Sequence, residues 1–161
     1  MSEAEFDVLC IGNAIVDILA RAEDDFIVDQ GLHKGTMHLI DAERAESLYA
    51  AMGPAIEASG GSAGNTAAGV ASFGGKAAFF GKVADDHLGG IYRHDIRSQG
   101  VVFGTEALEE YPPTARSMIF VTPDGERSMN TYLGACVELG PEDVEADIVA
   151  AAKVSYFEGY L

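Results

Sequence analysis

The chain has 161 residues, of which 48% are hydrophobic and 22% are charged, a composition typical of a globular domain rather than a disordered chain. Ten Lys and Arg against 26 Asp and Glu give a net charge of −16, which would repel a nucleic acid. No apolar run reaches the roughly 18 residues of a membrane-spanning helix, and the acidic start MSEAEFDVLC does not read as a secretion signal. We therefore expect a cytoplasmic protein that binds neither nucleic acid nor membrane.

The first half of the chain alternates buried strands with helices. Residues 6–12 (FDVLCIG) form a short apolar run that ends in Gly, which is typical of a buried parallel strand. Asp41 is suited to cap a helix over 41–52, whose apolar side chains fall on one face. A second buried strand is predicted in 76–84, and a helix over 85–100 follows and ends at Gly.

The second half of the chain returns to strands. Residues 115–122 (ARSMIFVT) and 126–133 (ERSMNTYL) predict a β-hairpin around a Pro-Asp-Gly turn. A helix is predicted over 140–154 because it opens with Pro and then acidic residues. A last buried strand is predicted in 154–161.

These elements predict an α/β fold in which a parallel sheet is flanked by helices. Segments near 17–40 and 101–133 do not fit the alternation, and we expect them to form a small inserted β-sheet. A parallel sheet is normally covered on both faces, and the sequence stops directly after a strand. We therefore expect residues 1–161 to be the front half of a larger domain.

Cysteine and histidine spacing gives no sign of a metal site. Cys10 and Cys136 lie far apart, without a CxxC pair, and none of the four histidines shares a ligand spacing with another. Cys10 lies in the apolar run VLCIG and is predicted to be a core residue. We expect no metal ligands in this chain.

A stretch of very small residues, 58–75 (ASGGSAGNTAAGVASFGG), has little to bury in a core. Gly60 and Gly61 can bring backbone close to a ligand, and the helix that follows offers free N–H groups at its start. This reading places the Asn65 amide near the strand ends. A tightly packed helix with a Gly-rich entry is the alternative, and the local sequence leaves both open.

Two polar residues follow the first strand, at the edge of a parallel sheet where ligands bind in such folds. These are Asn13 and Asp17. A carboxylate can accept hydrogen bonds from two neighbouring hydroxyls, although Asp17 would also suit a turn. Together with the Gly-Gly turn they predict a polar cluster suited to a polyol. A Rossmann-type oxidoreductase is disfavoured because no GxGxxG follows the first strand.

Residues 60–89 (GGSAGNTAAGVASFGGKAAFFGKVADDHLG) resemble the first signature of the ribokinase-like (PfkB) carbohydrate kinase family. The shared features are a Gly-Gly turn, a following Asn, and an end made of Gly81, Asp85 or Asp86, and Gly89. The segments IGNAIVDI and TPDGERSMNTYLGA resemble the adenosine kinase branch of that family. The resemblance covers essentially the whole chain.

The resemblance implies a kinase that uses ATP and Mg²⁺ to phosphorylate a hydroxymethyl group of a nucleoside or sugar, with adenosine expected first. Ribose, fructose or another sugar stays open. The inserted sheet would be a lid over the substrate. The implied site residues are Asn13, Asp17, Gly60, Gly61, Asn65, Asn130 and Tyr132 for substrate binding, and Arg127 near the phosphate end.

The family's second signature, a Gly-Ala-Gly-Asp turn with the general base, is absent from this sequence. We therefore expect no catalytic residue in the chain, and activity only with a missing C-terminal half or a companion chain. Helix capping is the better explanation for Asp85 or Asp86 than a replacement base. A non-catalytic sugar or nucleoside binding module is the alternative. An exposed lid edge could also pair two copies into a homodimer.

Overall fold

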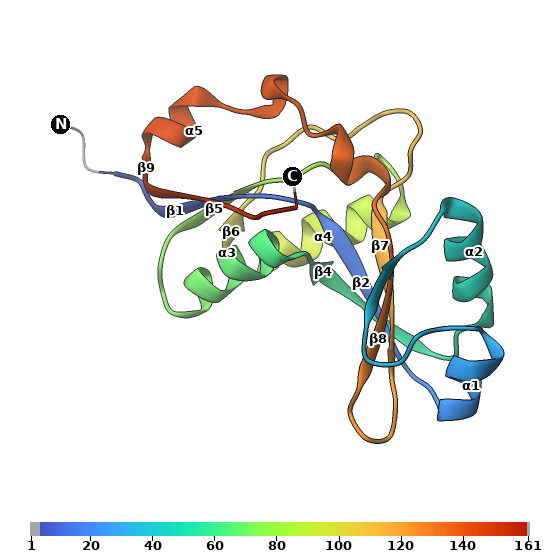
Figure 1. Cartoon of the computed structure of the whole chain (residues 1–161). Helices are drawn as coiled ribbons and strands as arrows, with labels where there is room; N and C mark the ends of the chain where they lie inside the picture. The colour runs from blue at the N-terminus through green and yellow to red at the C-terminus, as the bar shows by residue number, and fades with distance from the viewer. Residues whose placement is uncertain (1–3, 161) are drawn as a thin grey trace.

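The computed structural model describes residues 4–160, which contain two β-sheets joined at an angle (Figure 1). The first sheet is parallel throughout, in the order β6-β5-β1-β9. Its strands are β1 (Phe6–Ile11), β5 (Ala77–Phe80), β6 (Val101–Val102) and β9 (Ala152–Phe157).

The second sheet, which we call the lid sheet, has the order β3-β8-β7-β2-β4. Its strands are β2 (Ile15–Arg21), β3 (Met37–Leu39), β4 (Ala55–Gly60), β7 (Ala115–Val121) and β8 (Arg127–Tyr132). The lid sheet therefore includes β4, which the sequence analysis did not assign to it, whereas β6 pairs with β5 in the parallel sheet.

Helices cover the parallel sheet on both faces, as the sequence predicted. Figure 1 shows α3 (Ser62–Ser72) and α4 (His87–Ser98) on one face and α5 (Ala146–Ala150) on the other. Alternate side chains of β1 serve the two faces: Val8 and Cys10 pack in the larger core with α3 and α4, and Leu9 and Ile11 in a smaller core beneath α5. Cys10 is fully buried, which confirms its predicted place in the core.

Two further helices, α1 (Asp24–Asp29) and α2 (Ala42–Ala51), cover the outer face of the lid sheet (Figure 1). Asp41 caps α2 by accepting a hydrogen bond from the Arg44 N–H at 2.8 Å, as predicted. The Pro-Asp-Gly turn of the β7–β8 hairpin is also confirmed, with Gly125 at φ +86°. None of the helices in residues 4–160 is long and apolar enough to cross a membrane.

The helix predicted over 140–154 is wrong in extent. The structure has a 3₁₀ turn over Pro141–Asp143, two extended residues, and the short helix α5. The Asp143 carboxylate accepts a hydrogen bond from the Gly140 N–H and pairs with Lys82, so it closes a separate turn before the helix starts. Tertiary contact thus overrides the local helix pattern.

The last strand was predicted in 154–161 as buried, and the structure corrects this. It begins at Ala152, where it pairs with β1, and ends at Phe157. Because β9 lies at the edge of the sheet, its side chains are largely exposed, with Val154 at 58% and Phe157 at 61%. Residue 161 lies outside the described residues.

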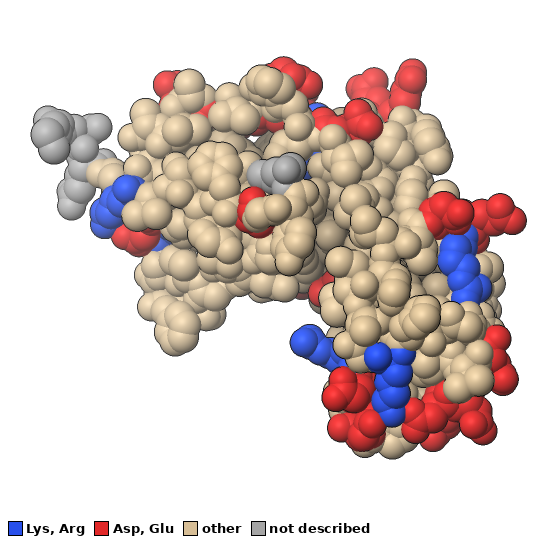
Figure 2. Space-filling view, viewed as in Figure 1, with Lys and Arg blue, Asp and Glu red and all other residues tan. Residues whose placement is uncertain are grey.

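Acidic side chains gather at the far end of the lid, around α1 and the β7–β8 turn (Figure 2). Lys34 lies among them, with its Nζ 2.6 Å from both Asp24 Oδ1 and Asp124 Oδ2. One lysine therefore joins the loop before β3 to helix α1 and to the hairpin turn. β3 itself pairs with β8 of the hairpin and forms part of the pocket described next.

Candidate functional site

A pocket of about 500 Å³ lies where the lid sheet meets the carboxyl ends of β1 and β9. Its walls come from four strands of the lid sheet (β2, β3, β7 and β8), from the start of α3, and from residues that follow β1, β4 and β9. The residues that line it are Asn13, Ile15, Asp17, Met37, Leu39, Gly61, Ser62, Asn65, Ser117, Ile119, Arg127, Met129, Thr131, Leu133, Glu158 and Tyr160. It lies at the edge of the parallel sheet where α/β folds bind ligands.

Strand register gives the lid wall of the pocket a polar row of side chains. Asp17 on β2 pairs with Ser117 on β7, and Ser117 pairs with Thr131 on β8. The Ser117 and Thr131 hydroxyls lie 2.9 Å apart and hydrogen-bond to each other. A carboxylate and two hydroxyls therefore stand side by side across three strands.

An apolar row runs beside the polar one. Ile119 on β7 pairs with Met129 on β8, and Met129 pairs with Met37 on β3. All three side chains face the same pocket. Met37 is 49% exposed and Leu39 beside it is 62% exposed, so the β3 end of this row is open, whereas Ile119 at the other end is buried at 3%.

Asp17 is the titratable group whose environment is most unusual in the pocket. Burial raises its carboxyl pKa from 3.8 to about 6, and the positive charge of Arg127 partly opposes that rise. Burying this carboxylate costs folding free energy, so we expect its charge to have a role at the site that offsets that cost. A perturbed acid in a pocket is a mark of a binding or catalytic position.

The Gly-Gly turn has no room for larger residues. A β-carbon at Gly60 would collide with the Asp17 carboxylate, and one at Gly61 would collide with the Asn13 carbonyl. Gly61 also has φ +83°, a conformation that favours glycine. The Asn65 N–H donates to the Gly61 carbonyl at 2.9 Å, which starts helix α3 at the pocket. The turn therefore packs tightly, and it also lies at the pocket; that it meets a ligand there stays a prediction.

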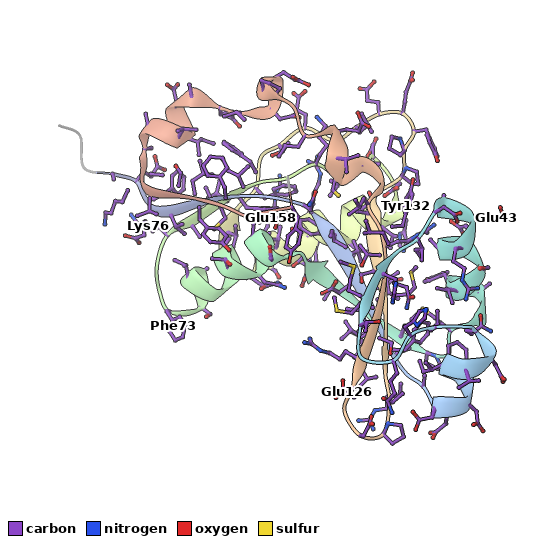
Figure 3. The ribbon with its side chains drawn as sticks, in the orientation of Figure 1. Glu43, Phe73, Lys76, Glu126, Tyr132 and Glu158 are labelled. Carbon is purple, nitrogen blue, oxygen red and sulfur yellow. The ribbon has the colours of Figure 1, made fainter. Side chains whose placement is uncertain are left out.

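Glu158, which follows β9, is a pocket residue that the sequence analysis did not identify. Figure 3 shows it at the junction of the two sheets. Its Oε1 accepts a hydrogen bond from the Asn13 N–H at 2.7 Å, and its Oε2 accepts from the Ser62 hydroxyl at 2.5 Å and the Ala63 N–H at 3.1 Å. The carboxylate thus occupies the N-terminus of α3, where a negative charge is favoured. An acid directly after the last strand was the available signal.

The predicted site residues divide into two groups. Those that line the pocket are Asn13, Asp17, Gly61, Asn65 and Arg127. Gly60 lies behind Asp17 instead of at the pocket surface.

Asn130 and Tyr132 were predicted to line the pocket, and the structure places them on the other face of β8. Side chains alternate along a strand, so Arg127, Met129 and Thr131 face the pocket while the residues between them face α2. Asn130 is 3% exposed and its amide Nδ2 donates to the Met118 carbonyl at 3.5 Å. Tyr132 lies on the side of α2 (Figure 3).

Among residues 4–160, no group of three or more His, Cys, Asp or Glu side chains is placed to hold a metal ion. The sequence likewise lacks a Gly-rich phosphate loop of the P-loop type. The polar groups that line the pocket are carboxylates, amides and hydroxyls, together with the guanidinium of Arg127.

Comparison with known proteins relates the chain to a family of kinases. The profile of the pfkB family carbohydrate kinases matches residues 7–161. Probable fructokinase-4 of Arabidopsis thaliana is 32% identical over 109 residues, which are 63% of this chain and 32% of that protein. Fructokinase of Solanum tuberosum is 30% identical over 104 residues, 63% of this chain and 33% of that protein.

Two solved structures are more similar to this chain in sequence than these fructokinases are. The adenosine kinase of Sinorhizobium meliloti is 73% identical with a TM-score of 0.92, over 98% of this chain and 48% of that one. A probable sugar kinase of Rhizobium etli is 72% identical with the same TM-score and coverage. The adenosine kinase of Schistosoma mansoni, solved with adenosine, shares the fold at 24% identity and a TM-score of 0.83, over 97% of this chain and 47% of that one. The chain spans about half the length of these structures.

Proposed function

Since the chain belongs to the pfkB family of carbohydrate kinases, we propose that it forms the substrate-binding half of a nucleoside kinase and that its substrate is adenosine. The observation that carries the proposal is the pair of rows on the lid wall, one polar and one apolar. A nucleoside has the same two parts, a polyhydroxyl ribose and a flat base. The high identity to an adenosine kinase of known structure supports the same choice.

The polar row would bind the ribose. The Asp17 carboxylate can accept hydrogen bonds from two adjacent hydroxyls, and the Ser117 and Thr131 hydroxyls lie in the same row. Asn65 is exposed at the start of α3, where its amide can reach the sugar from the opposite wall. These groups bind and orient the substrate, and together they supply the hydrogen bonds that hydroxyls lose on leaving water.

The apolar row would bind the base. Met37, Ile119 and Met129 line the pocket in one row across three strands, and the thioethers of methionine make favourable contacts with aromatic rings. A fructose molecule has no apolar plane of that kind, so these side chains would gain little from contact with it. The wall therefore favours a nucleoside over a free sugar.

ATP would be the phosphate donor and would bind together with Mg²⁺. Residues outside the described part of the chain would hold both. Arg127 lines the pocket and its side chain is exposed. Its guanidinium would meet the negative charge of a phosphate that approaches the sugar. The general base is expected in the part of the fold beyond the matched region. The residues of this chain hold the sugar, and the lid sheet excludes water from one side.

The exposed side chains of β9 also suit a chain that works as part of a longer fold. Val154 and Phe157 stand on an edge strand of a parallel sheet, a type of sheet that is normally covered on both faces. We place the remaining half of the kinase, or a companion chain, against this edge.

ADP release tests the proposal. The longest natural gene product that contains this chain is given Mg-ATP with adenosine, ribose or fructose, and turnover with adenosine is expected to be the fastest. Met129→Ser should lower the affinity for adenosine, whereas Val28→Ser, at an exposed residue of α1, should not change it. Faster turnover of fructose would replace the nucleoside with a sugar. Adenosine binding without any ADP release would favour the binding-module alternative.

A further inference from the structure

Tyr92 is a buried side chain of α4 that lies behind the Gly-Gly turn of the pocket. It is 0% exposed, and its ring packs edge-on against Phe103 and obliquely against Phe79, with centroids 5.5 and 6.2 Å apart. Its hydroxyl donates to the Gly60 carbonyl at 3.2 Å. A ring fixed on two sides therefore holds one hydroxyl against the backbone of the pocket.

Gly60 is held between Tyr92 and Asp17. The phenol binds its carbonyl, while the Asp17 carboxylate packs so closely on its α-carbon that a side chain would not fit. Gly64, in the first turn of α3, makes room for the same phenol, because a β-carbon there would lie 2.7 Å from Tyr92 Oη. Two glycines of the small-residue stretch thus accommodate this contact.

The same helix also holds the residue before Gly60. The Asp95 Oδ2 accepts from the Ser59 N–H at 2.7 Å and from the Ser59 hydroxyl at 2.8 Å. Tyr92 and Asp95 are three positions apart, so they lie on one face of α4. This face fixes two consecutive residues at the end of β4, immediately before the pocket begins.

Electrostatics keep the Tyr92 phenol protonated. Burial raises its pKa well above 10, and the negative charges of Asp17 and Glu158 raise it further. The phenol therefore stays protonated and able to donate a hydrogen bond, and both carboxylates of the pocket act on its pKa. Its hydrogen bond to Gly60 persists over the whole pH range in which Asp17 titrates.

We propose that Tyr92 is a positioning residue for the pocket: its hydroxyl fixes the Gly60 carbonyl, and the fixed Gly60 keeps the Asp17 carboxylate in place and shielded from water. Tyr92 touches no substrate in this arrangement and acts only through Gly60. The expected effect of Tyr92 on adenosine binding rests on the proposed function. The expected effect of Tyr92 on the Asp17 carboxylate does not rest on it.

Tyr92→Phe tests the proposal because it removes the hydroxyl and keeps the ring. Two readouts are needed in the longest natural gene product: the dissociation constant for adenosine, and the titration of the Asp17 carboxyl followed by carbon NMR. The groups that face Asp17 are Arg127 from β8 and Tyr92 from α4. We expect adenosine binding to weaken about tenfold and the midpoint of the Asp17 titration to fall as water reaches the carboxylate.

Tyr49→Phe is the matched control. The Tyr49 hydroxyl donates to Glu57 on β4 at 3.1 Å, so the same atom is lost beside the same strand, away from Gly60. Neither readout should change in this variant. If Tyr92→Phe lowers the melting temperature but leaves both readouts as in the wild type, Tyr92 is merely structural and the proposal fails.

A second pair of variants protects the test against a misfolded Tyr92→Phe protein. Gly64→Ala crowds the phenol from the side of α3, while Gly69→Ala in the same helix places its methyl in open space. Only the first should move the Asp17 titration, and equal behaviour of the two would overturn the proposal. If the wild type does not bind adenosine, the proposed function fails, and the Asp17 titration still decides the role of Tyr92.

Discussion

The carboxylate of Asp86 joins helix α4 to the start of strand β7 by binding Thr114. Asp86 Oδ1 accepts from the Gly89 N–H at 2.8 Å and the Thr114 hydroxyl at 2.7 Å, while Oδ2 accepts from the Thr114 N–H at 2.8 Å. Thr114 is 1% exposed, so its polar groups have no access to water. One side chain therefore caps a helix and fixes the point where the chain enters the lid sheet.

Replacing Asp86 with Ala should destabilise the fold strongly. The change removes the cap and leaves the buried Thr114 N–H without its acceptor, so the expected loss in the free energy of unfolding is about 2–4 kcal/mol. Asp85→Ala is the control, because Asp85 is exposed and makes its hydrogen bond to Leu108 through the backbone N–H. It should cost no more than about 0.5 kcal/mol in urea unfolding. Equal losses for the two variants would contradict this assignment of the cap.

Gly60→Ala should affect binding more than folding. Its methyl would displace the Asp17 carboxylate, which lies at the end of a rotatable side chain and can move at small cost. We expect the affinity for adenosine, measured by calorimetry, to fall about tenfold or more, equivalent to about 1.4 kcal/mol or more. Gly69→Ala, with its methyl in open space on α3, should instead raise stability by up to about 1 kcal/mol and leave affinity unchanged. A Gly60→Ala protein that binds as well as the wild type would refute the close packing.

Asp17 should make stability depend on pH between about 4 and 6. Its folded pKa of about 6 lies above the ordinary 3.8, so the folded chain binds more protons in that window and stability falls as pH rises through it. Above the window the deficit is on the order of 3 kcal/mol. Asp17→Asn removes this dependence. The variant should therefore be more stable than the wild type at pH 7.5, and the gap should narrow at pH 4.5, as urea unfolding at both pH values would show.

The same substitution should abolish most substrate binding, because it replaces one of the two acceptor oxygens with an NH₂ group that only donates, and it removes the charge that strengthens both hydrogen bonds. Stability and binding would then move in opposite directions at pH 7.5. A stability gap that is the same at both pH values would mean that the Asp17 pKa is not raised. A variant that keeps its affinity for adenosine would remove Asp17 from the site.

Local chemistry made much of this fold predictable. The local features are the helix caps at Asp41 and Asp86 and the hairpin turn at Gly125. Each depends on residues within three positions of each other, so it can be predicted from a short stretch of sequence. The first strand and the Gly-Gly turn were predicted for the same reason. Asp17 and Asn65 were chosen from their places beside those elements, and both line the pocket.

The errors arose where distant segments decide the outcome. Alternation along β8 divides its residues into two faces, but packing against α2 decides which face is covered, and this excluded Asn130 and Tyr132 from the pocket. Glu158 was missed because its partner Asn13 is 145 positions away, and its place directly after the last strand was the one local signal. The helix over 140–154 was cut short by a contact between Asp143 and Lys82, 61 positions apart.

Lys82 and Asp143 form a buried ion pair that should be costly to break from one side. Lys82 Nζ lies 2.5 Å from Asp143 Oδ1, and the two side chains are 11% and 5% exposed. Lys82→Met leaves a carboxylate buried without its cation, so we expect a loss of about 3–5 kcal/mol in the free energy of unfolding. Urea is the suitable denaturant because it does not screen charge.

A double variant separates the contribution of the ion pair to stability from the contributions of its two side chains. Lys82→Met with Asp143→Asn removes both charges, and the Asn side chain can still accept the Gly140 N–H that Asp143 accepts at 3.0 Å. Most of the lost stability should return. Lys153→Met is the control for net charge, since it breaks an exposed pair with Asp7 and should change stability far less. A double variant as unstable as Lys82→Met alone would show that Lys82 stabilises the fold through packing of its chain and not through its charge.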